Sequence, residues 1–114
     1  MGLDTYAQPN QDDELSERDV QVFMEAGINL CGGILSGNGN DGSFRGKVYD
    51  GIVCKITGCS LYQYWIPVED VAEMYRKLKS FRMEDYPGHE EDIENLRRFF
   101  KVCVDRELGL VGWW

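Results

Sequence analysis

The chain has 114 residues, the size of one ordinary domain, and its 43% hydrophobic and 28% charged residues are close to globular averages. This composition excludes a disordered or fibrous protein. Twenty acidic against twelve basic residues leave a net charge of -8, which disfavours direct binding of nucleic acid or of an anionic membrane. We therefore expect a single acidic domain over residues 1–114.

The charge is unevenly distributed along the chain. Residues 1–36 carry seven acids and one base, residues 37–68 two acids and three bases, and residues 69–114 eleven acids and eight bases. The middle segment is thus the only one without a net negative charge. An anion-binding site is expected there before anywhere else.

The first residues show neither a basic stretch nor an apolar one, as a secretory signal would require. No run approaches the ~18 apolar residues of a membrane span. These observations predict a cytoplasmic protein without membrane association.

The four cysteines are not spaced as zinc ligands. Structural zinc sites usually contain pairs of ligands with two to four residues between them, and the cysteines of this chain do not form two such pairs. In a reducing compartment we expect them to be small buried hydrophobic side chains. No metal and no other cofactor is expected. The cysteines are Cys31, Cys54, Cys59 and Cys103.

The first third of the chain predicts a strand, a helix and a second apolar segment. Leu3–Ala7 has the mixed polar and aromatic character of a short strand, and Pro9–Asp13 that of a polar loop. Ser16 is typical of a helix start, and Gly27 of a helix end. The apolar residues 28–35 are too few for a helix and predict a strand or a tightly packed turn.

Two helices are predicted in the middle of the chain. The first follows a glycine-rich loop, with Ser43 as its N-cap and Gly58 as its C-terminal stop. The second starts at Pro67, and the order of Glu73 and Lys77 favours an i,i+4 ion pair on its outer surface.

A fourth helix is predicted to start at Glu90 and to end near Gly109, because three acidic residues lie where its positive end would be. The tail Leu110–Trp114 is apolar, so we expect it to be shielded from solvent. Pairing with the Leu3–Ala7 strand would shield it, including both terminal tryptophans. The predicted fold class is α+β, mostly helical with about four helices, and with a small antiparallel pairing of the N- and C-terminal segments.

The chain matches no known catalytic or nucleotide-binding motif in full. Gly37-x-Gly39-x-x-Gly42 matches the dinucleotide fingerprint, but the acidic residue expected about 20 positions later is absent. The phosphate-binding loop and the calcium hand fail on the residues that they require around Gly42 and Val48. With one histidine and no Gly-x-Ser-x-Gly, the chain shows no workable pair of nucleophile and base.

A weaker pattern suggests an anion site at the start of the second predicted helix. A glycine-rich turn offers free backbone N–H groups, and two cations follow it at the positive end of the helix dipole, where acids are usual. Phe44 near the loop, and Tyr62, Tyr64 and Trp65 further on, are candidates for stacking on a planar ligand. The candidate ligand-binding residues are Gly37, Gly39, Gly42, Ser43, Arg45, Lys47, Tyr62 and Trp65.

Each part of this candidate site also has a structural interpretation. Arg45 would pair with a carboxylate such as Asp4 or Asp41 and only stabilise the loop. Tyr62 and Trp65 would pack the following helix against the rest of the fold, which is the commoner role of aromatic residues there.

Several short segments resemble a family of small uncharacterised prokaryotic and phage proteins. The matching segments are Met1-Gly-Leu-Asp-Thr-Tyr-Ala, Leu30-Cys-Gly-Gly, Ser36-Gly, Ser43-Phe-Arg-Gly-Lys-Val-Tyr49, Thr57-Gly and Ser60-Leu-Tyr. They cover about half of the chain, within residues 1–7 and 30–67. The resemblance implies kinship and carries no assigned activity.

The leading hypothesis from the sequence is a non-catalytic module in which residues 37–67 bind a small anionic ligand. One version is a phage protein that sequesters a nucleotide immune signal and so evades immunity. The alternative is an acidic interaction or inhibitor protein that presents its Asp12–Glu25 region to a basic partner, as a mimic of nucleic acid. A small enzyme acting on a nucleotide is the third hypothesis, and a homo-oligomer stays open.

Overall fold

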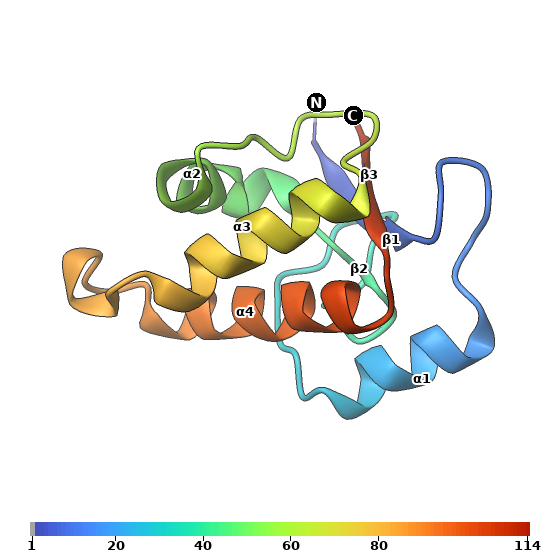
Figure 1. Ribbon diagram of the computed structural model, residues 1–114, viewed down its shortest axis with the longest axis horizontal. Coiled ribbons are helices and arrows are strands. Elements are labelled where there is room, and N and C mark those ends of the chain that lie inside the picture. The colour runs from blue at the N-terminus through green and yellow to red at the C-terminus, as the bar shows by residue number, and fades with distance from the viewer. Residues whose placement is uncertain (1) are drawn as a thin grey trace.

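The two ends of the chain meet in a small antiparallel sheet (Figure 1). The computed structural model describes residues 2–114, so Met1, with which the resemblance motif begins, lies outside the described residues. Strand β1 (Asp4–Gln8) lies between β2 (Ser43–Phe44) and β3 (Gly109–Trp113), in the order β2-β1-β3. The predicted pairing of the N- and C-terminal segments is confirmed, and β2 adds a short third strand.

Four α-helices and one 3-10 turn account for most of the remaining structure of residues 2–114, which confirms the mostly helical α+β prediction. They are α1 (Glu17–Glu25), α2 (Gly46–Thr57), α3 (Val68–Ser80), η1 (Met83–Asp85) and α4 (Glu90–Asp105). Helix α1 begins where predicted because Ser16 Oγ accepts a hydrogen bond from Asp19 N at 3.1 Å. None of the helices in this range combines the length and apolar character needed to cross a membrane.

The helices α2, α3 and α4 lie on one face of the sheet, which we call the inner face (Figure 1). Thr5 of β1, Phe44 of β2 and Leu110 of β3 belong to this face and are at most 1% exposed. The ring of Phe99 in α4 lies 4.8 Å from that of Phe44 and 4.9 Å from that of Phe23 in α1. An aromatic centre therefore joins the sheet to the helices.

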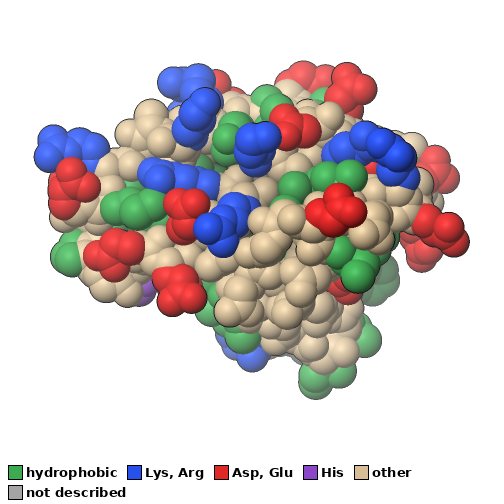
Figure 2. All heavy atoms as spheres, turned by 90° about the horizontal axis from the view of Figure 1, so that it is seen from below, with side chains coloured by type: hydrophobic (Ala, Val, Ile, Leu, Met, Phe, Trp, Pro, Cys, Tyr) green, Lys and Arg blue, Asp and Glu red, His purple; other side chains and the backbone are tan. Residues whose placement is uncertain are grey.

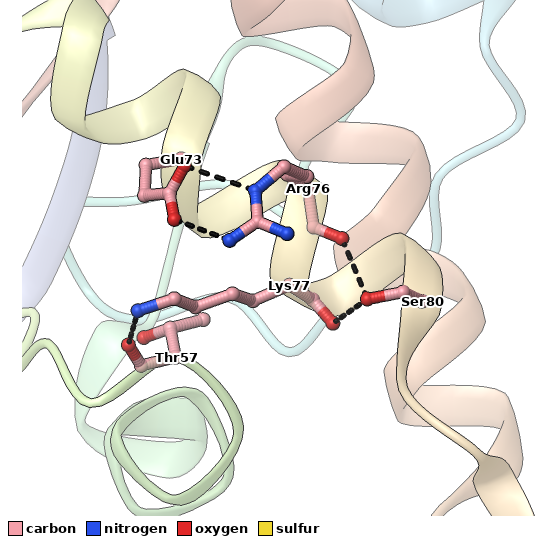
Figure 3. A network of polar contacts seen from close by, with 5 residues as sticks. All are labelled: Thr57, Glu73, Arg76, Lys77 and Ser80. Atoms are coloured by element: carbon pink, nitrogen blue, oxygen red, sulfur yellow. Dashed lines mark hydrogen bonds and ion pairs between the residues drawn. The ribbon is translucent and has the colours of Figure 1, made fainter.

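Helices α2 and α3 are connected by a polar network at the end of α2 (Figure 3). Lys77 Nζ donates a hydrogen bond to the carbonyl oxygen of Thr57 at 3.1 Å, and so satisfies one of the last carbonyls of α2. Glu73 pairs with Arg76 instead, through Arg76 Nε and Glu73 Oε2 at 3.0 Å. The predicted Glu73–Lys77 pair is wrong because Lys77 turns to the neighbouring helix.

The apolar segment 28–35 was predicted as a strand or a tightly packed turn, and it forms no strand but an irregular segment with a turn. Leu30 is buried in the core, whereas Leu35 is 70% exposed. The chain turns back on itself because Gly33 N donates to the carbonyl oxygen of Ser36 at 3.1 Å and to its hydroxyl at 3.0 Å. This turn places residues 34 and 35 at the surface beside the sheet.

Ser43 is not the N-cap of α2, contrary to the prediction. It lies in β2 opposite Tyr6, and α2 begins at Gly46 with Arg45 in the cap position and without a side-chain cap bond. The physical reason is the burial of Phe44, which requires extended backbone here. Burying one such ring stabilises by about 1.5–3 kcal/mol, against about 1 kcal/mol for a hydroxyl cap.

The two C-terminal indoles are less packed than predicted. The residues of β3 are buried up to Gly112, but Trp113, which lies opposite Asp4 at the end of the strand, is 64% exposed. Trp114 is 43% exposed, and its ring stacks on that of Tyr64 at 4.9 Å.

The cysteines differ in burial, which corrects the prediction that all four are core residues. Cys103 is fully buried, and burial raises the pKa of its thiol well above the ordinary range. Cys31 and Cys54 are exposed and Cys59 is half-buried, and all four are free thiols. Within residues 2–114, no group of three or more His, Cys, Asp or Glu side chains is placed to hold a metal ion.

Candidate functional site

The glycine-rich loop expected to hold an anion is closed on itself. Gly37 N donates to Ser43 Oγ and Gly39 N to the carbonyl oxygen of Ser43, both at 2.8 Å. Gly42 N donates to the carbonyl oxygen of Gly39 at 3.3 Å. These three N–H groups are not free, so the expected cradle of unpaired backbone donors is wrong. The loop instead holds β2 beside β1.

At the start of α2, the backbone N–H groups of the two predicted cations are also committed. Arg45 N donates to the carbonyl oxygen of Cys31 at 2.8 Å, and Lys47 N to that of Leu3 at 3.1 Å. The side chain of Arg45 is half-buried and that of Lys47 exposed. Among the described residues, neither side chain has an ion-pair or hydrogen-bond partner.

Asp4 and Asp41 do not pair with Arg45 in the described part of the chain, contrary to the structural interpretation of that residue. Asp4 accepts a hydrogen bond from the hydroxyl of Ser36. Asp41 Oδ1 accepts from Ser43 N at 3.0 Å and from Ser43 Oγ at 2.8 Å. Both carboxylates thus order the loop through its serines.

Tyr62 and Trp65 lie on another part of the molecule. Trp65 packs so closely over Gly109 that a Cβ at that glycine would overlap the indole. The ring of Tyr62 contacts that of Trp114 edge to face, at 5.5 Å. Of the eight predicted site residues, Gly42 and Ser43 line one cavity together, and the other six do not line it.

This cavity is a groove of about 540 Å³ on the side of the sheet away from α2, α3 and α4, and we call it the outer groove. Residues directly opposite in an antiparallel pair share a face, so Tyr6 and Ser43 lie opposite the core. Its volume is within the range of about 300–1,000 Å³ that is typical of ligand pockets. Its lining consists of Tyr6, Ala7, Gln8, Glu14, Leu15, Val20, Leu35, Asp41, Gly42, Ser43 and Trp113.

Both edges of the sheet are covered, so that a partner can reach its outer face but not its edges. Ile66 and Leu110 exchange backbone hydrogen bonds at 2.8 and 2.9 Å along β3. Along β2, the carbonyl oxygen of Ser43 accepts from Gly39 N. Addition of a strand from another chain is therefore disfavoured.

The acidic and basic side chains that line the outer groove are unevenly represented. Among the described residues that line it, Glu14 and Asp41 are carboxylates and none is Lys, Arg or His. Burial, followed by the charges of Asp4 and Asp41, raises the pKa of Tyr6, so that its phenol stays neutral. The groove therefore has a negative potential.

The hydroxyl protons in the groove are already used. Tyr6 Oη donates to the carbonyl oxygen of Leu35 at 2.7 Å, and Ser43 Oγ donates to Asp41 Oδ1 at 2.8 Å. Gln8 Oε1 is shielded from solvent and has no hydrogen-bond partner among the described residues. The charges of Glu14 and Asp41, with the lone pairs of Asp41 Oδ2, thus suit a ligand that donates hydrogen bonds.

The rest of the lining is apolar and partly exposed. Leu15 and Val20 are half-buried, whereas Leu35 and Trp113 are largely exposed. The acidic segment 12–17 continues from Glu14 along the surface. Figure 1 places the loop before α1 at the right of the molecule, and Figure 2 shows Asp and Glu side chains at the right of its view. A surface that combines apolar and charged side chains in this way is typical of protein interfaces.

The sequence interpretation missed most of the residues of this groove. Alternation along β1 contains a signal for Tyr6 and Gln8, because residues 5 and 7 face the core and their neighbours must face away. Trp113 comes beside Tyr6 through the pairing of the terminal strands, which the sequence predicted, although not that the indole faces a groove. Leu35 is brought to Tyr6 by a contact between distant parts of the chain, for which a single sequence contains no signal.

Comparisons with protein-family models, with curated proteins and with solved structures found no significant match to this chain. The resemblance to small prokaryotic and phage proteins therefore stays a prediction.

Proposed function

We propose that this chain is a non-catalytic interaction protein that binds a positively charged partner protein through the outer groove. The observation that carries the proposal is the lining, which combines apolar side chains such as Leu35 and Trp113 with Glu14 and Asp41 and, among the described residues, with no cation. It develops the hypothesis of an acidic interaction or inhibitor protein, whose expected surface, Asp12–Glu25, borders the groove.

The overall charge supports a basic partner over an anionic one. With a net charge of -8, the molecule attracts cations and repels phosphates over about a Debye length, roughly 8–10 Å at physiological salt. Such a field accelerates encounter with a basic surface, and contacts with the apolar side chains of the groove then slow dissociation. Inhibition of a protein that itself binds nucleic acid fits this mode of action.

A test uses two fluorescently labelled eight-residue peptides, one of alternating Lys and Leu and one of alternating Glu and Leu. Fluorescence anisotropy should detect binding of the basic peptide alone, and its dissociation constant should rise steeply with salt. Glu14→Gln should weaken binding about twofold to fivefold, as expected for one rim charge.

Glu69→Gln is the matched control, because it removes the same charge from an exposed position on α3 that does not line the groove. Equal losses for the two variants would show an effect of net charge alone. Absence of binding by the basic peptide at low salt would refute the proposal.

A small anionic ligand, such as a sequestered nucleotide, is the second candidate function. The observation that favours it is that the side chains of Arg45 and Lys47 have no partner among residues 2–114. Calorimetric titration with a panel of nucleoside mono- and diphosphates, on the wild type and on Arg45→Ala, tests it. Binding that is lost in Arg45→Ala would establish this function in place of the first.

A further inference from the structure

We infer that the outer groove takes one arginine side chain of the partner protein, with its guanidinium at the carboxylates of Glu14 and Asp41. This inference rests on the proposed function and names the chemical group that the site recognises. The carboxylates, the indole of Trp113 and the leucines of the lining together carry it.

The charged end of the occupant follows from the hydrogen-bond groups on offer. Asp41 uses Oδ1 for Ser43, which leaves Oδ2 available, and Glu14 makes no side-chain hydrogen bond within the described residues. The donor protons of Tyr6 and Ser43 are already committed to Leu35 and Asp41. A group that brings several N–H donors and a positive charge therefore complements the groove.

The long apolar stem of the occupant follows from the walls. Leu15 and Leu35 offer aliphatic surface, against which the methylene groups of an arginine can pack. Trp113 is 64% exposed and presents an indole at the same groove. A guanidinium stacks on an indole and donates to carboxylates in a plane, which an ammonium does less well.

A second copy of this chain is a poorer occupant. In a symmetric dimer the same patch faces itself, so the acidic rim of one copy would meet that of the other. Each copy carries a net charge of -8, and the described lining holds no cation to neutralise the pair. A basic partner avoids this repulsion.

The experiment compares three labelled peptides of the sequence Ac-Gly-Leu-X-Leu-Gly, where X is arginine, lysine or citrulline. Citrulline has nearly the shape of arginine without its charge. Anisotropy should show the arginine peptide binding most tightly, the lysine peptide weaker, and the citrulline peptide at least about tenfold weaker than arginine.

Trp113→Ala and Trp114→Ala form a matched pair of variants of adjacent, exposed tryptophans, of which only the first lines the groove. Trp113→Ala should weaken the arginine peptide about tenfold and reduce the preference over lysine, because the stacking surface is lost. Trp114→Ala should leave both unchanged. Thermal melts of the two variants would test whether each is folded.

Each other outcome overturns the inference in a distinct way. If lysine and arginine peptides bind equally and Trp113→Ala has no effect, this inference fails while a basic partner still stands. If free spermidine binds as tightly as the arginine peptide, the ligand is a small polyamine. If neither the Lys-Leu octapeptide nor any of these peptides binds, the proposed function fails as well.

Discussion

The inner and outer faces of the three-stranded sheet come from the same strands but have different surroundings. On the inner face, Thr5 and Leu110 are buried against the helices. On the outer face, Tyr6 and Trp113 border an open groove with acidic side chains. Because side chains alternate along a strand, residues an odd number of positions apart belong to opposite faces, and substitutions at such positions should separate stability from binding.

The largest effect on stability is expected for Phe99→Ala. Its ring is fully buried between those of Phe23 and Phe44, so truncation leaves a cavity that links α1, α4 and β2. The free energy of unfolding should fall by about 3–5 kcal/mol, as measured by urea denaturation. The exposed Tyr64→Ala serves as control, and equal losses for both variants would contradict the core described above.

A comparison within β3 tests the two faces directly. Leu110→Ala on the inner face should cost about 2–5 kcal/mol, whereas Trp113→Ala on the outer face should change the unfolding free energy by less than about 0.5 kcal/mol. Chemical denaturation of both variants measures this. A loss above about 2 kcal/mol for Trp113→Ala would show that the indole is packed, as the sequence alone predicted.

A smaller loss is expected for Arg106→Gln. Arg106 Nε donates to Asp19 Oδ1 at 2.7 Å, and the side chain of Asp19 is only 12% exposed, so the carboxylate would lose its charged partner. We expect a cost of about 1.5 kcal/mol. Since this pair holds α1 against the end of α4, and α1 contributes Val20 to the outer groove, binding of the Lys-Leu peptide should also weaken.

Arg76→Gln is the control for this variant, because Arg76 pairs with Glu73 at the surface of α3. It should leave both unfolding and peptide binding nearly unchanged. If Arg106→Gln behaves in the same way, the ion pair between Arg106 and Asp19 contributes nothing measurable to the unfolding free energy, and peptide binding in the groove does not depend on it.

The sequence predicted the elements that local chemistry determines. Ser16 and Gly58 correctly predicted the start of α1 and the end of α2, because caps depend on residues close in the chain. The pairing of the terminal strands was also correct, since the apolar tail needed cover. Ser43 was misassigned because burial of its neighbour Phe44 outweighed a favourable cap.

The candidate site was harder to predict because it depends on how distant segments meet. The glycine-rich loop is a different case, because its N–H groups are satisfied locally: Ser43 Oγ, only six residues from Gly37, accepts one of them, and composition does not show which way the loop closes. The groove needed Leu35 to lie beside Tyr6, a contact between residues 29 positions apart. Neither partner has a sequence pattern that indicates the other.

The smallest effect on stability is expected for Arg45→Ala, at the boundary between the two faces where β2 leads into α2. Its guanidinium has no ion pair or hydrogen bond among the described residues, so its removal leaves no carboxylate without a partner. The unfolding free energy should change by less than about 0.5 kcal/mol. Differential scanning calorimetry of the variant, with Lys47→Ala as a neighbouring control, measures this change.

A large loss of stability in Arg45→Ala would show that the residue holds the fold, as the structural interpretation of the sequence proposed. Unchanged stability together with lost nucleotide binding would instead favour the anionic ligand. A third outcome is that Arg45→Ala keeps its stability and binds the Lys-Leu peptide as tightly as the wild type, while the wild type binds no nucleotide. This outcome would leave the outer groove as the binding site of this protein, because Arg45 does not line it.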